Sequence, residues 1–410
     1  PPPPSPRPAP LHSHAQLCPA RHRLAQLRRA WHRLALIGRA WHSLPQIGTK
    51  AEPQIIPTNA GLRTWAVPPE GLQDNIVPND LFYIRNHWKD SPEIDINTFT
   101  LKIDGEVERE ITLSFEDLKK LPQKRFQVTF ECCGNSPVPE YYTKALRISS
   151  VMEQIKGHGI MGNAEWAGVS LKDVLELAGV KDSAVEVMFE GADHGADEVV
   201  GDPAEVTYER SLPMKKALHE DTILAYEMNG EPLPKDHGYP LRLLVSGWYG
   251  MNSVKWLVGI HVLDHKFEGC YMTHRYMTMN EPGNPEPYRY YGKLQVKSII
   301  TNPVPGELIP SSGYTLAGAA WSGEEDIEKV EISTDGGETW SPVDTLHPRE
   351  AYSWYRWEHN WNPPAEGKYT IMSRATNSDG ITQPMEFPNP WDGRGYGNNM
   401  VFPYDVEVRG

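Results

Sequence analysis

The stretch V-T-F-E-C-C-G-N, residues 128–135, decides how this chain is interpreted, because it presents a single candidate metal thiolate, Cys132. Three stretches rich in cations stand far from it in the sequence: R-N-H at 85–87, D-H-G-Y-P-L-R at 236–242 and S-V-K-W at 253–256. One thiolate cannot hold a zinc ion or an iron–sulfur cluster, which take about four protein ligands. A single soft sulfur with many cations indicates a metal carried by an anionic organic cofactor, for which the protein supplies one ligand and the counter-charges.

The composition argues against two classes of protein. The 410 residues carry a net charge of −14 and a pI of about 5.6, whereas a nucleic-acid partner would demand a basic surface. No apolar run approaches the roughly 18 residues of a bilayer-spanning helix, so no transmembrane segment is expected. The four cysteines, Cys18, Cys132, Cys133 and Cys270, are too few and too scattered for a disulfide framework.

The first residues differ in character from the rest. Residues 1–50 contain seven arginines, one lysine and no acid, whereas residues 51–410 hold 32 basic and 54 acidic side chains. A proline-rich start precedes an approximate ten-residue repeat, seen in R-A-W-H-R-L-A-L-I-G (29–38) and R-A-W-H-S-L-P-Q-I-G (39–48). We therefore predict a basic, low-complexity, disordered leader over residues 1–58. Three explanations of it stay open: a targeting segment, an artefact of the translation start, and a binding helix.

Residues 59–294 show the pattern of a domain with mixed short strands and helices. F-T-L-K-I-D-G-E-V (99–107) alternates as a strand with an Asp-Gly turn, and S-F-E-D-L-K-K-L-P (114–122) predicts a short capped helix. V-S-L-K-D-V-L-E-L-A-G-V (169–180) predicts an amphipathic helix that ends at Gly179. Because strands and helices do not alternate as β-α-β units, an α+β fold is expected. Further strands are predicted at 184–191, 222–230 and 241–247.

The last part of the chain changes to a pattern of alternating strands. Residues 280–294, with three prolines and several tyrosines, are predicted as a linker. Asp335-Gly336-Gly337 is a strong hairpin signal. The spacing of the strands over residues 295–410 is typical of a β-sandwich of immunoglobulin type, without the disulfide of antibody domains. The strands are expected within 314–321, 329–340, 352–361 and 367–377.

Taken together, these motifs resemble the sulfite oxidase family of molybdopterin enzymes. V-T-F-E-C-C-G-N, R-N-H, A-Y-E-M-N-G-E-P-L-P-K-D-H-G-Y-P-L-R (225–242) and S-V-K-W-L stand in the family's order, and A-W-S-G and S-T-D-G-G-E-T-W are similar to its dimerisation domain. The resemblance covers roughly residues 60–408. It implies a molybdopterin-binding domain at 59–294, a dimerisation sandwich at 295–410, a homodimer, and a molybdenum-molybdopterin cofactor.

Carried over position by position, the resemblance makes Cys132 the protein's ligand to the metal. The alternative is a buried apolar cysteine; Cys133, where the family has a small residue, is interpreted as packing. A cofactor phosphate and a polar ring system demand fixed donors, and arginine suits phosphate because its planar fork makes paired charge-assisted bonds. The resemblance assigns this cofactor-binding work to His87, His237, Arg242, Ser253 and Lys255.

The resemblance also implies a cationic substrate pocket. Arg85 is expected to bind the anion, and Tyr208 in V-T-Y-E-R-S-L-P matches the family's pocket tyrosine, which can donate to an oxyanion. The resemblance also suggests Arg356 as a further arginine that the sandwich contributes near the site, with stacking on Trp354 or Trp357 as the alternative. One departure is that Ser136-Pro137 stand where the animal enzymes have a pair of arginines, which places strict sulfite specificity in doubt.

The resemblance implies oxidation of sulfite, or a related sulfur oxyanion, to sulfate by oxygen-atom transfer. Ser136-Pro137 and Y-M-T (271–273) look closer to bacterial subunits that oxidise carrier-bound sulfur, so a sulfane dehydrogenase component is the first alternative. Nitrate reduction on the same fold and a non-catalytic binding protein are the others. Without a C-x-x-C-H motif for covalent haem, electrons are expected to leave to an external acceptor such as a c-type cytochrome, or to oxygen. The expected location is periplasmic or otherwise exported, with a cytoplasmic or organellar one as the alternative.

Overall fold

The computed structural model describes residues 56–59, 64–135, 159–197, 202–279, 288–388 and 395–410. Most of the predicted leader, and the departure at Ser136-Pro137, lie outside these ranges. The predicted leader extends too far, however, because residues 56–58 belong to a strand. This strand, β1 (Ile56–Asn59), pairs with β2 (Thr64–Ala66), and β2 pairs with β3 (Ile84–Arg85).

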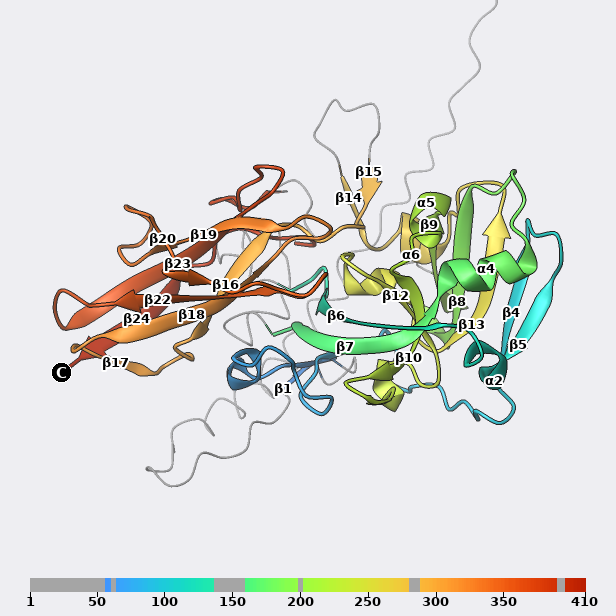
Figure 1. Cartoon of the computed structure of the whole chain (residues 1–410), viewed down its shortest axis with the longest axis horizontal. Helices are drawn as coiled ribbons and strands as arrows, with labels where there is room; N and C mark the ends of the chain where they lie inside the picture. Colours follow the sequence, from blue (N-terminus) through green and yellow to red (C-terminus); the bar gives the residue numbers. More distant parts are fainter. Residues whose placement is uncertain (1–55, 60–63, 136–158, 198–201, 280–287, 389–394) are drawn as a thin grey trace, which may run out of the picture. The chain divides into compact units, whose positions relative to one another are not determined.

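Two five-stranded sheets form the framework of the first domain (Figure 1). One has the order β11-β10-β7-β6, with β12 also paired to β10. The other has the order β5-β4-β13-β8-β9, in which β4 and β13 are parallel. The first sheet comprises β6 (Gln123–Glu131), β7 (Met161–Ser170), β10 (Thr222–Met228), β11 (Glu231–Pro232) and β12 (Arg242–Val245). The second comprises β4 (Thr100–Gly105), β5 (Ile111–Ser114), β8 (Glu186–Asp197), β9 (Asp202–Pro213) and β13 (Leu257–Leu263).

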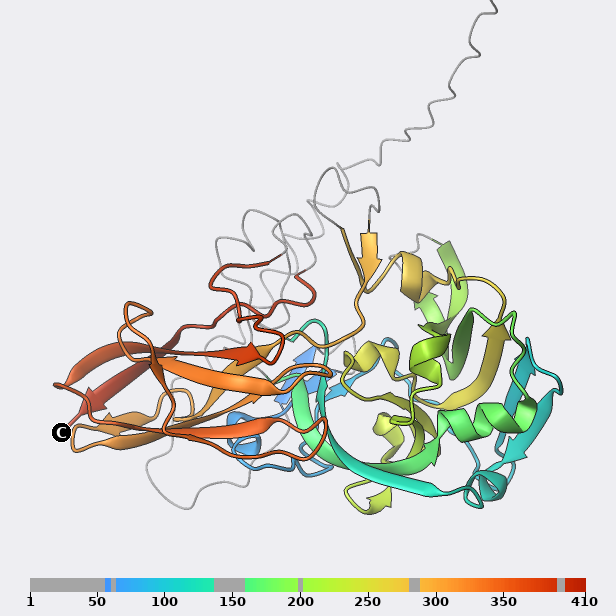
Figure 2. The same cartoon turned by 45° about the horizontal axis from the view of Figure 1, so that its top comes forward.

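The helices of this domain are short. A capping box at Ser114 and Asp117 starts α2 (Phe115–Leu118), as the sequence predicted. The predicted amphipathic helix is α4 (Leu171–Ala178), which ends at Gly179 in the left-handed conformation and lies against β4, β7 and β10 (Figures 1 and 2). The others are α5 (Met214–Ala217), α6 (Cys270–Thr273), η1 (Pro69–Leu72), η3 (Lys235–His237) and η4 (Gly250–Asn252).

The α+β prediction is confirmed in part, because 45% of the described residues are in strands and only 10% in helices. The linker prediction is wrong for residues 288–290, which form β15 (Tyr288–Tyr290) and pair with β14 (Met277–Met279). Prolines at 282, 285 and 287 suggested an unstructured link, but the tyrosine-rich residues after them have high β propensity.

The last part of the chain is two sheets that pack face to face, drawn in orange and red in Figure 2. They share a core that contains Leu316, Trp357, Ile371 and Val408. The predicted hairpin at Asp335-Gly336-Gly337 is confirmed between β19 and β20. The immunoglobulin type of the sandwich stays a prediction. One sheet comprises β16 (Lys297–Asn302), β18 (Tyr314–Trp321), β22 (Tyr355–Trp361) and β21 (Thr345–Leu346); the other comprises β17 (Leu308–Pro310), β24 (Tyr404–Arg409), β23 (Gly367–Asn377), β19 (Ile327–Ser333) and β20 (Ser341–Pro342).

Gly105, at the end of β4, is required by the parallel pairing of β4 with β13. Its φ is +88°, and a Cβ there would lie 2.1 Å from the carbonyl oxygen of Val262. Gly230, in the Asn-Gly turn between β10 and β11, has a similar φ of +80° but open space around it. We expect Gly105→Ala to lower the free energy of unfolding by about 2–4 kcal/mol, from left-handed strain and overpacking together. Gly230→Ala should lower it by about 1 kcal/mol, from strain alone. Chemical denaturation of both variants measures the difference, and equal losses would contradict the predicted clash.

Candidate functional site

A single cavity collects eight of the nine site residues predicted from the sequence. About 640 Å³ of space, its open mouth included, is free of protein atoms. The eight residues are Arg85, His87, Cys132, Tyr208, His237, Arg242, Ser253 and Lys255. They come from β3, β9, η3, β12 and the segments that follow β3, β6 and η4, so the fold brings distant motifs to one place.

Cys132 follows the last residue of β6. Its backbone N–H donates to the carbonyl of Ile160 at 3.0 Å, and its own carbonyl accepts from Asn135 N–H at 2.8 Å. A hydrogen bond from the Cys133 thiol, the charge of Arg85 and the Gly134 N–H lower the pKa of Cys132 to about 7, against the opposing effect of burial. Burial raises the pKa of Cys133 well above its usual range. Of the two neighbours, Cys132 is therefore the one suited to act as a thiolate ligand.

Arg242 is a buried cation without a carboxylate partner in the described part of the chain. Its Nη1 and Nη2 donate to the carbonyls of His237 and Ser253, each at 3.0 Å. Its guanidinium lies 4.9 Å from the centre of the Phe130 ring and 5.1 Å from that of Trp166. Burial lowers its pKa to about 10, which still leaves it charged at neutral pH. Two carbonyls and two aromatic rings therefore hold one positive charge at the cavity wall.

Lys255 brings a second buried cation to the cavity. Its Nζ donates to Asn86 Oδ1 and, at 2.9 Å, to the carbonyl of Asp236. Burial lowers its pKa to about 7; the charge of Arg242 acts in the same direction, and Asp193 acts against it. An anion in the cavity would restore the protonated form.

Arg85 and His87 stand on the same segment with different charges. Burial acts to lower the pKa of Arg85, but the nearby Tyr276, Cys132 and Tyr396 together raise it. Burial, with Arg85 next in effect, lowers the pKa of His87 well below its usual range, so its imidazole is neutral. Tyr276 Oη lies 2.6 Å from His87 Nε2, and the Tyr208 ring stacks on His87 with centroids 4.7 Å apart. His237 is also neutral, because burial lowers its pKa to about 3.

The structure adds Asp193 and Tyr276 to the cavity, and sequence reasoning missed both. Burial raises the pKa of Asp193 to about 6, and its Oδ1 has no hydrogen-bond partner. The signal in the sequence was an aspartate inside the strand 186–197, where aspartate is disfavoured. Tyr276 has a φ of +55°, a rare conformation for a bulky residue and one that often marks a functional site.

Arg210 is a third residue that the sequence did not single out. It is buried on β9 and donates to the carbonyl of Tyr271 and, at 2.5 Å, to Asn252 Oδ1. Its Nε has no partner, and no carboxylate among the described residues pairs with it. Burial lowers its pKa. It places one more positive charge behind the cavity wall, beside the ring of Tyr276 at 5.9 Å.

These groups fit an anionic, polar cofactor. Buried charges are normally paired, yet Arg242 and Arg210 face carbonyls and aromatic rings. The one carboxylate in the cavity lining, Asp193, has an orphaned oxygen. A molybdopterin would supply both the missing negative charge and the missing hydrogen-bond partners, while Cys132 offers the thiolate that its metal requires.

The prediction that Arg356 lies near the substrate is corrected. Its Nη1 donates to the carbonyl of Leu72 at 2.9 Å and its Nη2 to that of Gln73 at 2.9 Å. The guanidinium lies 5.4 Å from the centre of the Trp354 ring, so the stacking alternative describes it. Arg356 lines a different hollow, where it donates hydrogen bonds to the carbonyls that the end of η1 leaves without helical partners.

Comparisons with known proteins match both parts of the chain. A family model for an oxidoreductase molybdopterin binding domain matches residues 88–271, and one for a Mo-co oxidoreductase dimerisation domain matches residues 289–409. Sulfite oxidase of Gallus gallus is 32% identical over 348 residues, which are 80% of this chain and 73% of that protein. Mitochondrial sulfite oxidase of Mus musculus is 33% identical over 362 residues, which are 83% of this chain but only 63% of that protein. The sulfane dehydrogenase SoxCD of Paracoccus pantotrophus has a similar structure, with a TM-score of 0.71, 26% identity, and coverage of 90% of this chain and 92% of that one.

The raised pKa of Asp193 predicts an unusual pH dependence of stability. In cofactor-free protein, Asp193 stays protonated in the folded state up to about pH 6, whereas in the unfolded state it loses its proton near pH 4. Between these two pH values the unfolded state is favoured increasingly, so this group lowers the free energy of unfolding as the pH rises. Asn cannot ionise, so Asp193→Asn should avoid this loss. The difference in free energy of unfolding between the variant and the unchanged protein should be about 1–3 kcal/mol more favourable to the variant at pH 8 than at pH 4. Denaturation at both pH values measures the gain. The exposed Asp264→Asn is the control, and an equal gain there would contradict the assignment.

Proposed function

Because the chain belongs to the sulfite oxidase family, we propose that it is a molybdenum-dependent oxidoreductase that oxidises sulfite, or a related sulfur oxyanion, to sulfate. The observation that carries the proposal is one cavity in which Cys132 faces buried cations that lack carboxylate partners. A small divalent oxyanion and an anionic cofactor both meet this need.

The cofactor would be held by Cys132 at the metal and by Arg242, Lys255, His87, His237, Ser253 and Asp193 around the pterin and its phosphate. Arg242 is fixed on both sides before any ligand enters, so little ordering is left to be done on binding. Ser253 Oγ accepts from the N–H of Val245 at 2.9 Å, which turns its own proton toward other acceptors. When bound, the cofactor supplies two-electron oxygen-atom transfer.

The substrate would meet Arg85 and the tyrosines. Arg85 supplies a charge that stays positive at every physiological pH, and Tyr276 Oη can donate to an oxyanion or hold a proton shared with His87 Nε2. Tyr208 Oη donates to the carbonyl of Met251 at 2.7 Å, so its hydroxyl is not available to the substrate. Its role would be to orient His87, on which its ring stacks. The protein's part in catalysis is thus a preorganised cationic wall.

A second candidate is oxidation of sulfane sulfur carried by a partner protein. The likeness to SoxCD supports it, as does Ser136-Pro137 in place of the arginines of animal enzymes. A substrate that meets fewer cations loses electrostatic attraction, so free sulfite would bind less tightly and a carrier-bound group of lower charge would be accepted.

The proposed partners follow from the same family. We infer a homodimer formed through residues 295–410 and an external electron acceptor, with a c-type cytochrome as the first choice. None of the described helices reaches the length and apolarity of a bilayer crossing. We propose an exported, periplasmic location, supported only by the family's bacterial members.

Cys132→Ser tests the metal ligand. Loss of the thiolate should lower turnover by more than about 100-fold, because even outer partners of a metal site are worth 10–100-fold. Cys133→Ala is the matched control: this side chain is buried and only donates a hydrogen bond to Cys132, so molybdenum content near one atom per chain should remain and turnover should fall far less than in Cys132→Ser. Elemental analysis and steady-state rates check both. A Cys132→Ser protein with unchanged turnover would overturn the proposal.

Substrate identity is tested with molybdenum-replete protein and cytochrome c as acceptor. We expect saturable reduction of the cytochrome with sulfite, weakened by salt because the attraction is electrostatic. A carrier-bound persulfide and nitrate with a reduced donor are the competing arms. Faster turnover of the persulfide, by about tenfold or more in kcat/KM, would transfer the assignment to the sulfane dehydrogenase class.

A further inference from the structure

A fully buried ion pair joins the residue before Cys132 to the sandwich. Glu131 ends β6 and has 0% of its surface exposed; Lys297 begins β16 and has 1% exposed. Lys297 Nζ donates to Glu131 Oε1, and Trp321 Nε1, at the end of β18, donates to Glu131 Oε2 at 3.0 Å. Both oxygens of this carboxylate are therefore held by residues that lie beyond residue 294.

The same lysine reaches the other side of the cysteine turn. Lys297 Nζ donates to the carbonyl of Asn135 at 3.1 Å, and Asn135 Nδ2 donates to Glu131 Oε1 at 3.1 Å. One ammonium thus ties together the residues on both sides of the segment 132–134. The amide oxygen of Asn135 in turn accepts from the N–H groups of Gly159 and Ile160, at 3.2 and 3.0 Å.

A third contact from the end of the chain closes the turn. The N–H of Gly397 donates to the carbonyl of Cys133 at 2.7 Å. The ring of Tyr396 lies at van der Waals distance from the position that a side chain on Gly134 would occupy, 3.8 Å away. The loop that carries Cys132 is therefore held in place by contacts from β16, β18 and residues 396–397.

Stability does not by itself explain this arrangement. Replacement of a buried ion pair by apolar residues of similar volume is often neutral or stabilising, since desolvation offsets the attraction. What such a pair adds is a directional constraint on the groups that it joins. Here the constrained groups flank a candidate metal ligand, and a ligand displaced by about 1 Å loses much of its chemistry.

We propose that Lys297 and Trp321 are positioning residues for Cys132, so that the sandwich forms part of the metal site as well as a subunit contact. This inference rests on the proposed function, because it requires a metal bonded to Cys132. Neither residue lines the cavity; both act through Glu131 and Asn135.

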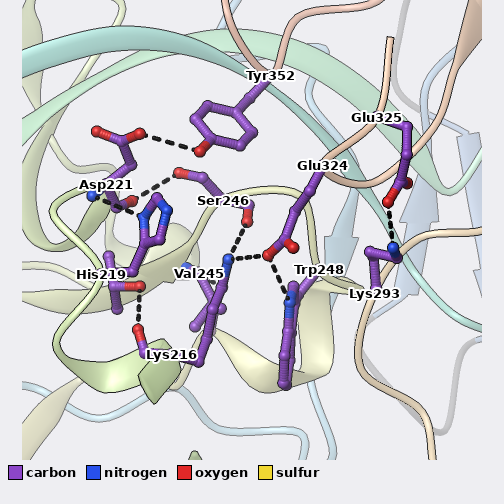
Figure 3. A network of polar contacts seen from close by, with 12 residues as sticks. Lys216, His219, Asp221, Val245, Ser246, Trp248, Lys293, Glu324, Glu325 and Tyr352 are labelled. Atoms are coloured by element: carbon purple, nitrogen blue, oxygen red, sulfur yellow. Dashed lines mark hydrogen bonds and ion pairs between the residues drawn. The ribbon is translucent and has the colours of Figure 1, made fainter. Parts of the chain in front are cut away.

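The chain offers a matched control in a second lysine–glutamate contact between the same two parts of the chain (Figure 3). Lys216, buried on α5, pairs with Glu324 at 2.5 Å and donates to the carbonyl of Ser246 at 3.0 Å. Trp248 Nε1 also donates to Glu324, at 3.3 Å. The donors match Lys297 and Trp321 in type, although the Glu324 side chain is 42% exposed where Glu131 is fully buried, and none of these partners belongs to the turn at 131–135.

The test compares the double variants Glu131→Gln/Lys297→Met and Lys216→Met/Glu324→Gln in the holoprotein. Molybdenum per chain, the electron paramagnetic resonance signal of Mo(V) after partial reduction, and the thermal midpoint are measured. We expect the first variant to change the g-values of the signal, to lose molybdenum and to lower kcat by about 10–100-fold. The second should keep the signal of the unchanged protein even where its thermal midpoint falls.

Trp321→Phe is the milder variant, and it decides the matter if the first double variant does not fold. It removes one N–H donor and keeps the ring, so a smaller change of the signal in the same direction is expected. Unchanged molybdenum content and an unchanged signal in Trp321→Phe and in any folded Glu131→Gln/Lys297→Met would overturn the inference and leave the proposed function standing. Molybdenum present without sulfur oxidation would overturn the proposed substrate alone, and unchanged protein without molybdenum would overturn both proposals.

Discussion

The rest of the site depends on buried positive charge that the described protein does not neutralise. Arg242 and Arg210 donate to carbonyls and an amide oxygen and lie beside aromatic rings. Lys255 also donates to carbonyl and amide oxygens, and its pKa is lowered to about 7. A cation without a counter-ion in a low-dielectric interior is costly. Folding of the empty cavity is therefore opposed by the same charges that would bind an anionic cofactor, so binding and stability are linked.

Much of this site could be predicted from the sequence, because four motifs keep their charged residues in short, recognisable runs. Cys132, His237, Arg242 and Lys255 belong to such runs, and the fold brings them together. Asp193 and Tyr276 lie outside these runs, and the only local signal for Asp193 is an aspartate inside a strand. Arg210 lies in V-T-Y-E-R-S-L-P, two residues after Tyr208, but a single arginine in a strand carries no signal of its own. Their place follows only from the pairing of β8 and β9 with the rest of the sheet and from the turn at α6.

The fold shows the same division between local and tertiary information. Helices α2 and α4 were predicted because a capping box and a glycine stop are local signals. The preponderance of sheet was underestimated, since strands as short as β3 and β11 exist only through their partners. Arg356 shows the limit of motif reasoning. Its place in a strand was compatible with a side chain near the substrate or with one stacked on a tryptophan, and its hydrogen bonds to the carbonyls at the end of η1 fix the second arrangement.

The boundary between the two family models is not a boundary of packing. Trp321 and Trp354 of the second part belong to the hydrophobic core of the first, and Lys297, the first residue of β16, is as deeply buried as that core. The turn that carries Cys132 has its two sides joined by that lysine. Both parts must therefore be folded and packed together before the sulfur of Cys132 takes its final position. Cofactor binding would then depend on the packing of the sandwich as well as on the cavity itself.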